Sequence, residues 1–160
     1  MTEIEKLEFM FIEILNQHED FSSNIEEHFK RKRNESKFDN IFLKFVDCYH
    51  FEISSLTMIE FDSEIKEDSN FYYFGMFESD YLVINKISHR VQLINHYKTL
   101  LCECAVDGKS FLYAFLEYFK IPENFYEMSD KEDFNFRVER SKKCSELSGG
   151  FNFFTTEYSP

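Results

Sequence analysis

Cysteine and histidine are the side chains best suited to nucleophilic or metal chemistry, and this sequence contains few of them. The four cysteines are Cys48, Cys102, Cys104 and Cys144, and no two of them have the C-x2-C spacing of a zinc ligand pair. Cys102 and Cys104 are two residues apart in a predicted strand. Their side chains therefore share one face and can pack as small apolar groups. We expect four buried free thiols.

Catalytic motifs are absent from the sequence. It has no G-x-S-x-G, no H-E-x-x-H, no dinucleotide-binding G-x-G-x-x-G and no deaminase signature, and Ser148-Gly149-Gly150 lacks the P-loop pattern. Catalysis by a cysteine and a histidine stays open, because such partners need only meet in space. However, no cysteine begins a predicted helix beside a basic residue, which would lower its pKa. We expect a non-enzymatic protein without catalytic, cofactor-binding or metal-binding residues.

Acidic residues are concentrated between positions 60 and 80, where seven carboxylates and one lysine give a net charge of −6, half of the −12 of the whole chain. One interpretation is a solvated loop and hairpin tip; the other is an acidic docking surface with tyrosines as binding anchors. A calcium loop is disfavoured, because the D-x-[DN]-x-[DN]-G spacing is missing. The candidate partner-binding residues are Glu60, Asp62, Glu64, Glu67, Asp68, Glu78, Asp80, Tyr72, Tyr73 and Tyr81. For each tyrosine, burial in the sheet is the alternative.

The overall charge restricts the classes of partner. A chain of 160 residues with net charge −12 lacks the basic surface of a direct nucleic-acid binder and favours basic protein partners. No apolar run approaches the roughly 20 residues of a membrane span. The N-terminus carries acidic residues where a signal peptide carries basic ones. We expect a cytoplasmic protein that contacts neither nucleic acid nor membrane; its oligomeric state is left open.

The N-terminal third of the chain has helical periodicity. Thr2 can cap a first helix over residues 3–17, and a second helix is predicted from Ser22 or Ser23 to the basic run Lys30–Arg33. That basic run has two interpretations: a solvated helix end, which we favour, or a nucleic-acid or targeting patch. A third helix is predicted over Phe38–Tyr49.

The central stretch alternates apolar and polar residues in the manner of strands. Strands are predicted near 56–61, 71–74, 81–85, 91–94 and 99–105, with a turn at Lys86–His89. Asp107 to Ser110 can cap a helix over 109–120, and Ser129 or Asp130 a helix over 131–147 that ends at Gly149-Gly150. The fold class is therefore α+β: a single domain, 1–160, with a twisted, mainly antiparallel sheet of about four to six strands centred on 56–105 and wrapped by N-terminal (1–33) and C-terminal helices.

The order of features across residues 38–150 resembles the SUKH superfamily, whose pattern is a "dy..fl" helix, an "iG" strand, a "d.lvid" strand, a "V" strand, "sf..fl" at a helix start and "a..aGG". The corresponding residues here are Phe38–Phe45, Phe74-Gly75, Asp80–Asn85, Val91, Ser110–Leu116 and Cys144–Gly150.

The resemblance implies a mostly non-enzymatic family in which many bacterial members are immunity proteins. These bind polymorphic toxins, often nucleases, in the cytoplasm, while other members, including fungal ones, are regulators or scaffolds. The leading hypothesis is thus an immunity-type protein that neutralises a cognate, basic toxin domain through its acidic surface. The alternatives are an intracellular scaffold or regulatory domain without a toxin partner and, third, a small enzyme or metal-binding protein.

Overall fold

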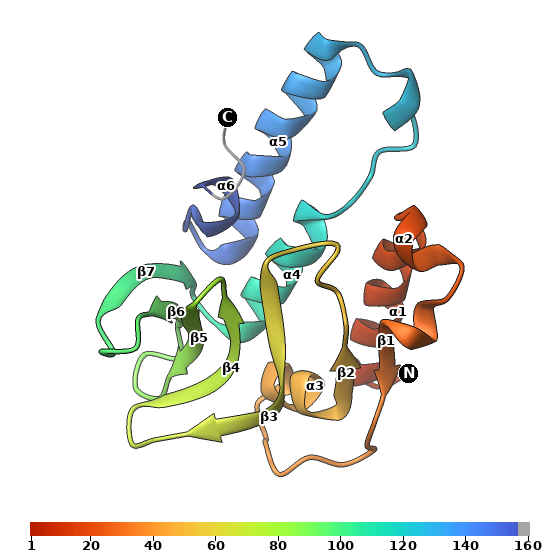
Figure 1. Cartoon of the computed structure of the whole chain (residues 1–160). Helices are drawn as coiled ribbons and strands as arrows, with labels where there is room; N and C mark the ends of the chain where they lie inside the picture. The colour runs from red at the N-terminus through yellow and green to blue at the C-terminus, as the bar shows by residue number, and fades with distance from the viewer. Residues whose placement is uncertain (157–160) are drawn as a thin grey trace.

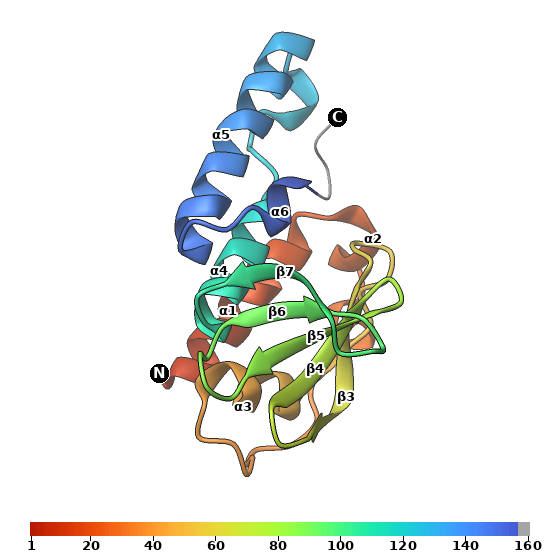
Figure 2. The same cartoon turned by 90° about the vertical axis from the view of Figure 1, so that its left-hand side faces the viewer.

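A computed structural model describes residues 1–156 and has an α+β architecture built on one antiparallel sheet (Figure 1). Five strands follow one another in the order of the chain, so that each hairpin places the next strand beside the last. Turned by 90°, the sheet faces the viewer and α1, α3 and α4 lie behind it (Figure 2). The strands of this sheet are β3 (Ile59–Glu67), β4 (Phe71–Phe77), β5 (Asp80–Asn85), β6 (Val91–Ile94) and β7 (Leu100–Ala105).

Short turns set the register of this sheet. The predicted turn at Lys86–His89 is confirmed: the Asn85 side chain accepts bonds from the amides of Ile87 and Ser88, and His89 has a φ of 64°. The ladder β5–β6 then pairs Tyr81 with Ile94 and Ile84 with Val91. Bulges interrupt the ladders on both sides of it, which adds to the twist of the sheet.

Helices close the inner face of the sheet. Helix α1 (Glu3–Asn16) begins with the predicted cap, in which Thr2 and Glu5 bond each other's backbone amides. The third helix, α3 (Ile41–Cys48), is shorter than the predicted Phe38–Tyr49 and is capped by Asn40. Asp107 caps α4 (Gly108–Tyr118), as predicted. Helix α4 lies between α1 and the sheet, where its apolar side meets both.

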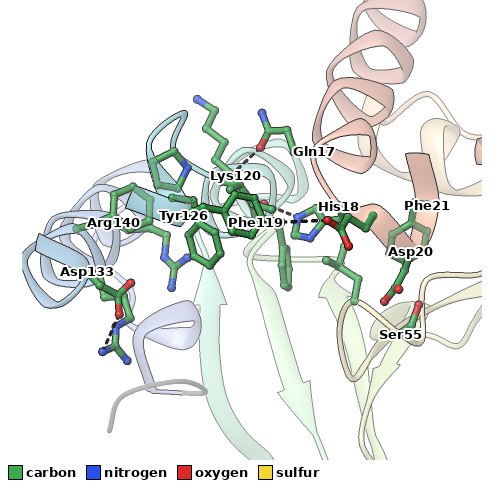
Figure 3. A pocket seen from close by; sticks show the side chains of 17 residues that line it. Gln17, His18, Asp20, Phe21, Ser55, Phe119, Lys120, Tyr126, Asp133 and Arg140 are labelled. Atoms are coloured by element: carbon green, nitrogen blue, oxygen red, sulfur yellow. Dashed lines mark hydrogen bonds and ion pairs between the residues drawn. The ribbon is translucent and has the colours of Figure 1, made fainter. Parts of the chain in front are cut away.

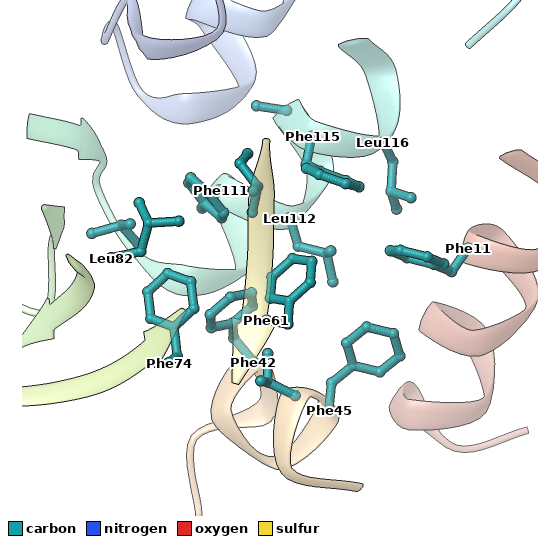
Figure 4. Packing of buried hydrophobic residues seen from close by; sticks show 14 of the residues in the cluster. Phe11, Phe42, Phe45, Phe61, Phe74, Leu82, Phe111, Leu112, Phe115 and Leu116 are labelled. Atoms are coloured by element: carbon teal, nitrogen blue, oxygen red, sulfur yellow. The ribbon is translucent and has the colours of Figure 1, made fainter. Parts of the chain in front are cut away.

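Phenylalanine dominates the core (Figure 4). Among residues 1–154, 13 of the 21 phenylalanines of the chain are buried, which places most of this unusual composition in packing. Phe115 of α4 shows the arrangement: its ring centroid lies 5.8 Å from that of Phe11 on α1, 5.7 Å from Phe61 on β3 and 4.8 Å from Phe119. One cluster thus joins the N-terminal helices, the sheet and α4.

The C-terminal part extends beyond the sheet. A 3₁₀ turn, η2 (Phe125–Glu127), leads to α5 (Asp130–Ser148), which Ser129 caps and which projects away from the body (Figure 1). Gly149, with a φ of 93°, ends it as predicted. The short α6 (Phe153–Thr156) then returns Phe153 and Phe154 to the core.

The predicted helix over residues 22–33 is wrong. The segment contains α2 (Glu19–Ser22), a 3₁₀ turn η1 (Ile25–Glu27) and a strand β1 (Phe29–Arg31) that pairs with β2 (Tyr49–Phe51). The basic run is therefore not a solvated helix end. The guanidinium of Arg31 donates to the Tyr49 hydroxyl at 2.8 Å, and Arg33 lies 3.4 Å from the buried Asp47 carboxylate.

Of the two interpretations of the acidic stretch, the solvated loop is wrong for the residues directly after Phe61. Strand β3 continues through the acidic stretch to Glu67, with Ile59, Phe61 and Ile65 buried and the charged residues between them half-buried or exposed. The acidic residues therefore lie on a strand, so the backbone of the sheet fixes where their side chains are.

Candidate functional site

A hollow on the outer face of the sheet is lined by five of the ten predicted contact residues. It occupies about 590 Å³ between the second half of β3, the middle of β4, the start of β5 and the β6–β7 turn. We call it the acid–tyrosine hollow. Its lining consists of Asp62, Ser63, Glu64, Lys66, Glu67, Tyr73, Met76, Tyr81, His96 and Lys98.

An irregularity in β3 positions the carboxylates of this hollow. The β3–β4 ladder pairs Phe61 with Gly75, and the next pair is Lys66 with Tyr73, so extra residues of β3 bulge between them. The bulged residues include Asp62 and Glu64. The strand thus buries Ile65 on the inner side while it holds the acidic side chains around the hollow.

Asp68 organises one wall of the hollow from the β3–β4 turn. Its Oδ2 accepts a 2.6 Å hydrogen bond from the Tyr73 hydroxyl and lies 2.9 Å from the Lys98 ammonium; its Oδ1 accepts from the amides of Asn70 and Phe71. The bond from Tyr73, followed by the bonds from Lys98 and the two amides, holds the pKa of Asp68 well below its usual range. This cluster fastens the β6–β7 turn to the turn between β3 and β4.

Two tyrosines form the floor of the hollow. The rings of Tyr73 and Tyr81 meet edge to face with centroids 5.6 Å apart, and both side chains are half-buried. Burial, followed by the bond to Asp68, raises the pKa of Tyr73 to about 12, so its hydroxyl stays a hydrogen-bond donor at neutral pH. Rigid, partly exposed aromatic rings beside carboxylates are suited to binding cationic or amphipathic side chains.

The charge of the hollow is smaller than the sequence suggests. Its lining has three carboxylates, Asp62, Glu64 and Glu67, but also Lys66 and Lys98. Glu67 lies 3.6 Å from the ammonium of Lys86, and Asp68 is paired with Lys98. Burial raises the pKa of Asp62, and Glu60 raises it further, while Lys66 lowers it. The remaining negative charge is thus concentrated on the bulged part of β3.

Five of the ten predicted contact residues do not line the hollow, and Asp68, which bonds to the lining residues Tyr73 and Lys98, is one of them. Tyr72 points to the inner side, where its ring meets that of Phe38 at 5.9 Å, so burial against the core was the correct alternative for it. Glu78 and Asp80 lie at the β4–β5 turn, away from the lining. Glu60 lies on β3 opposite the lining residue Met76 but is not itself part of the lining.

Sequence reasoning missed the contribution of the β6–β7 turn. His96 and Lys98 line the hollow because Ile94, next to the turn, pairs with Tyr81. The available signal was the hairpin itself: once Val91–Ile94 is paired with β5, the following turn must lie near the start of β5. A side-chain partner for Asp68 could not have been read from the sequence, because 30 residues separate it from Lys98.

A second depression lies between the helices, on a different part of the molecule (Figure 3). This interhelical hollow of about 490 Å³ lies between the end of α1, the segment after α4, and α5, and it includes Tyr126 and Arg140. The end of α1 is fastened to the end of α4: His18 Nε2 donates to the Phe119 carbonyl at 2.7 Å, and Gln17 Oε1 accepts from the Ile121 amide at 2.7 Å. Its lining includes both acidic and basic side chains.

Within residues 1–156, no group of three or more histidine, cysteine or acidic side chains could hold a metal ion. The four cysteines are free, as predicted, but only Cys48, Cys104 and Cys144 are buried, whereas Cys102 is half-buried. No helix in the same range is long and apolar enough to cross a membrane.

Comparison with protein-family models, with curated proteins and with solved structures found no match to this chain.

Proposed function

We propose that this protein is a non-enzymatic, cytoplasmic immunity-type protein that binds and neutralises a cognate toxin domain, possibly a nuclease, through the acid–tyrosine hollow. The observation that carries the proposal is the convergence of Asp62, Glu64 and Glu67 with Tyr73 and Tyr81 on one exposed face of a rigid sheet. The resemblance of residues 38–150 to the SUKH superfamily and the net charge of −12 give independent support.

The physical basis of the proposal is complementarity with a basic surface. A nuclease presents a basic cleft to the phosphates of its substrate, so an acidic partner is steered to that cleft and can occupy it. Charge mainly sets the association rate and the choice of partner, whereas aromatic anchors supply much of the affinity. The hollow offers both kinds of side chain within one surface.

Coexpression tests the proposal. The toxin domain encoded next to this protein should stop growth when expressed alone, and growth should return when this chain is coexpressed. A purified mixture should show a stable complex. Failure of the chain either to bind or to protect would refute the immunity function.

The surface is tested by a charge-reversal variant. Glu60, Glu64 and Glu67 are exposed, and changing all three to lysine alters the net charge by +6. Asp62 and Asp68 are left unchanged, because burial and the bonds of Asp68 give them structural roles. We expect at least a tenfold slower association at low salt, with the difference shrinking as salt rises.

The matched control carries the same change of charge elsewhere. Glu13, Glu26 and Glu27 are exposed on the N-terminal elements and do not line the hollow. Their reversal to lysine should leave most of the affinity intact. Equal loss in both variants would assign the effect to net charge and refute the hollow as the binding surface.

The second candidate is a scaffold or regulatory domain without a toxin partner. The interhelical hollow favours it, because a second depression lined by exposed Phe125 and Tyr126 offers another contact surface. This candidate predicts a protein partner in cells, no protection against the neighbouring toxin, and loss of the partner on Tyr126→Ala rather than on charge reversal in β3.

A further inference from the structure

Three large apolar side chains lie exposed within five residues of one another, next to the acid–tyrosine hollow. Tyr97, in the turn between β6 and β7, is 78% exposed, and Leu100 and Leu101, at the start of β7, are 49% and 47% exposed. We call these three residues the β7 patch. Single exposed apolar residues are common on soluble proteins, but residues that gather in this way are typical of a contact surface.

Strand register places the patch on the same face of the sheet as the hollow. Tyr81 on β5 pairs with Ile94 on β6, and Ile94 pairs in turn with Leu100 on β7. Residues paired across neighbouring strands project to one face, so Leu100 shares the face of Tyr81, which lines the hollow. Ile94 between them is buried, although it lies outside the core cluster. An apolar row therefore runs from the hollow to the edge strand β7 (Figure 2).

The β6–β7 turn belongs to both surfaces. His96 and Lys98 line the hollow on either side of Tyr97 in the sequence, and the ring centroids of His96 and Tyr97 are 3.9 Å apart. The Asn95 side chain accepts a 2.9 Å bond from the Tyr97 amide, and Lys98 pairs with Asp68 at 2.9 Å. Because these bonds hold the turn in shape, Tyr97 can meet a partner with little loss of backbone entropy.

The patch differs in charge from the other edge of the sheet. Between Asn95 and Cys102, Lys98 is the only lysine, arginine or carboxylate, and Asp68 neutralises it. Strand β3, at the opposite edge, carries four carboxylates and one lysine in nine residues. The outer face thus joins an acidic part to an apolar part, and protein–protein interfaces combine a polar rim with an apolar centre in the same way.

We propose that the β7 patch is the apolar half of the binding surface whose charged half is the acid–tyrosine hollow. This inference rests on the proposed function. The partner is a protein whose basic cleft is bordered by exposed aliphatic or aromatic side chains, and these cover the patch when the cleft meets the hollow. The hollow has only three carboxylates against two lysines, so charge steers association while the apolar contact slows dissociation.

Binding kinetics with the toxin domain encoded next to this protein test the inference. Tyr97→Ala and Leu100→Ala together should raise the dissociation rate about tenfold or more and leave the association rate and its salt dependence unchanged. The charge reversal in β3 has the opposite effect, slower association at low salt. Near-ultraviolet circular dichroism checks that each variant is folded. Tyr97→Ala alone changes a side chain that is mostly exposed, and it should raise the dissociation rate in the same direction.

Ile87→Ala is the matched control. Ile87 is 87% exposed on the turn between β5 and β6, at the other end of these strands from the hollow. Its truncation removes an exposed aliphatic side chain, as Leu100→Ala does, and should leave binding unchanged. Wild-type dissociation by the double variant, or equal acceleration by Ile87→Ala, would overturn the inference and leave the proposed function standing. No binding by the wild type would refute the proposed function and this inference with it.

Discussion

The two faces of the five-stranded sheet share the same strands but hold different chemistry. On the inner face Phe61, Phe74 and Leu82 are packed into the aromatic core, while on the outer face Tyr73 and Tyr81 stay half-buried beside carboxylates. The inner face stabilises the fold by removing apolar surface from water. The outer face carries charge on a backbone that the inner face holds in place, so substitutions on the two faces should have separable effects.

The largest effect is expected on the inner side. Phe115→Ala removes the ring that joins α1, β3 and α4. Replacing a buried phenylalanine with alanine lowers the free energy of unfolding by about 3–5 kcal/mol. Chemical denaturation monitored by circular dichroism measures it. The matched outer variant, Tyr81→Ala, should cost about 1 kcal/mol or less. Similar losses in the two variants would remove the distinction between the faces.

Gly75 tests the spacing between β3 and β4. A Cβ built on Gly75 would lie only 2.3 Å from the carbonyl oxygen of Glu60, which is a backbone atom. Neither atom can rotate away, because the backbone fixes the position of both. Gly75→Ala should therefore separate the strands and lower the free energy of unfolding by about 1–3 kcal/mol. Hydrogen exchange should locate the loss in these two strands. An unchanged exchange rate there would contradict the close approach.

The wall of the hollow gives a smaller effect that depends on pH. Asp68→Asn removes the charge that binds Tyr73 and Lys98, at a cost of about 1 kcal/mol at neutral pH because the cluster is partly solvated. The folded pKa of Asp68 lies below its unfolded value, so this stabilisation is present above about pH 4 and is lost as the pH falls further.

Denaturation at several pH values measures this contribution. Between about pH 5 and pH 2 the stability of the wild type should fall more steeply than that of Asp68→Asn. Tyr73→Phe, which removes the hydroxyl and keeps the ring, should flatten the same profile in part. Parallel profiles for the wild type and Asp68→Asn would show that the cluster contributes nothing.

The sequence predicted the fold well where local signals act alone. The caps at Thr2, Asp107 and Ser129 and the stop at Gly149 need only neighbouring residues, and each was found as predicted. The predicted helix over 22–33 failed because Phe29 pairs across the chain with Phe51, a contact that local propensity does not contain. The start of β3 was predicted, but its continuation beyond Phe61 was missed, because the bulge breaks the alternation and acidic residues are rare in strands.

The candidate site was predicted only in part, for the same reason. Proximity in sequence correctly grouped Asp62, Glu64 and Glu67 with Tyr73, since one hairpin joins them. Alternation should have separated Tyr72 from Tyr73, because successive side chains of a strand point to opposite faces. Lys98, which pairs with Asp68, comes from another hairpin. The net charge of residues 60–80 therefore overstated the negative charge of the folded surface.

The smallest effect on stability is expected from the charge reversal in β3. Lysine at positions 60, 64 and 67 changes the net charge from −12 to −6, and the exposed side chains lose only the 3.6 Å contact between Glu67 and Lys86. Surface substitutions of this kind usually change the free energy of unfolding by about 0.5 kcal/mol or less. The lower net charge also reduces repulsion between the acidic side chains, which offsets part of any loss. Adding Asp68→Lys should lower stability further by about 1 kcal/mol, because Tyr73 and Lys98 then lose their acceptor. The triple variant could instead have a free energy of unfolding as low as that of the quadruple variant. That result would mean that the carboxylates of β3 stabilise the fold. A loss of partner binding in the triple variant could then no longer be attributed to its surface charge alone.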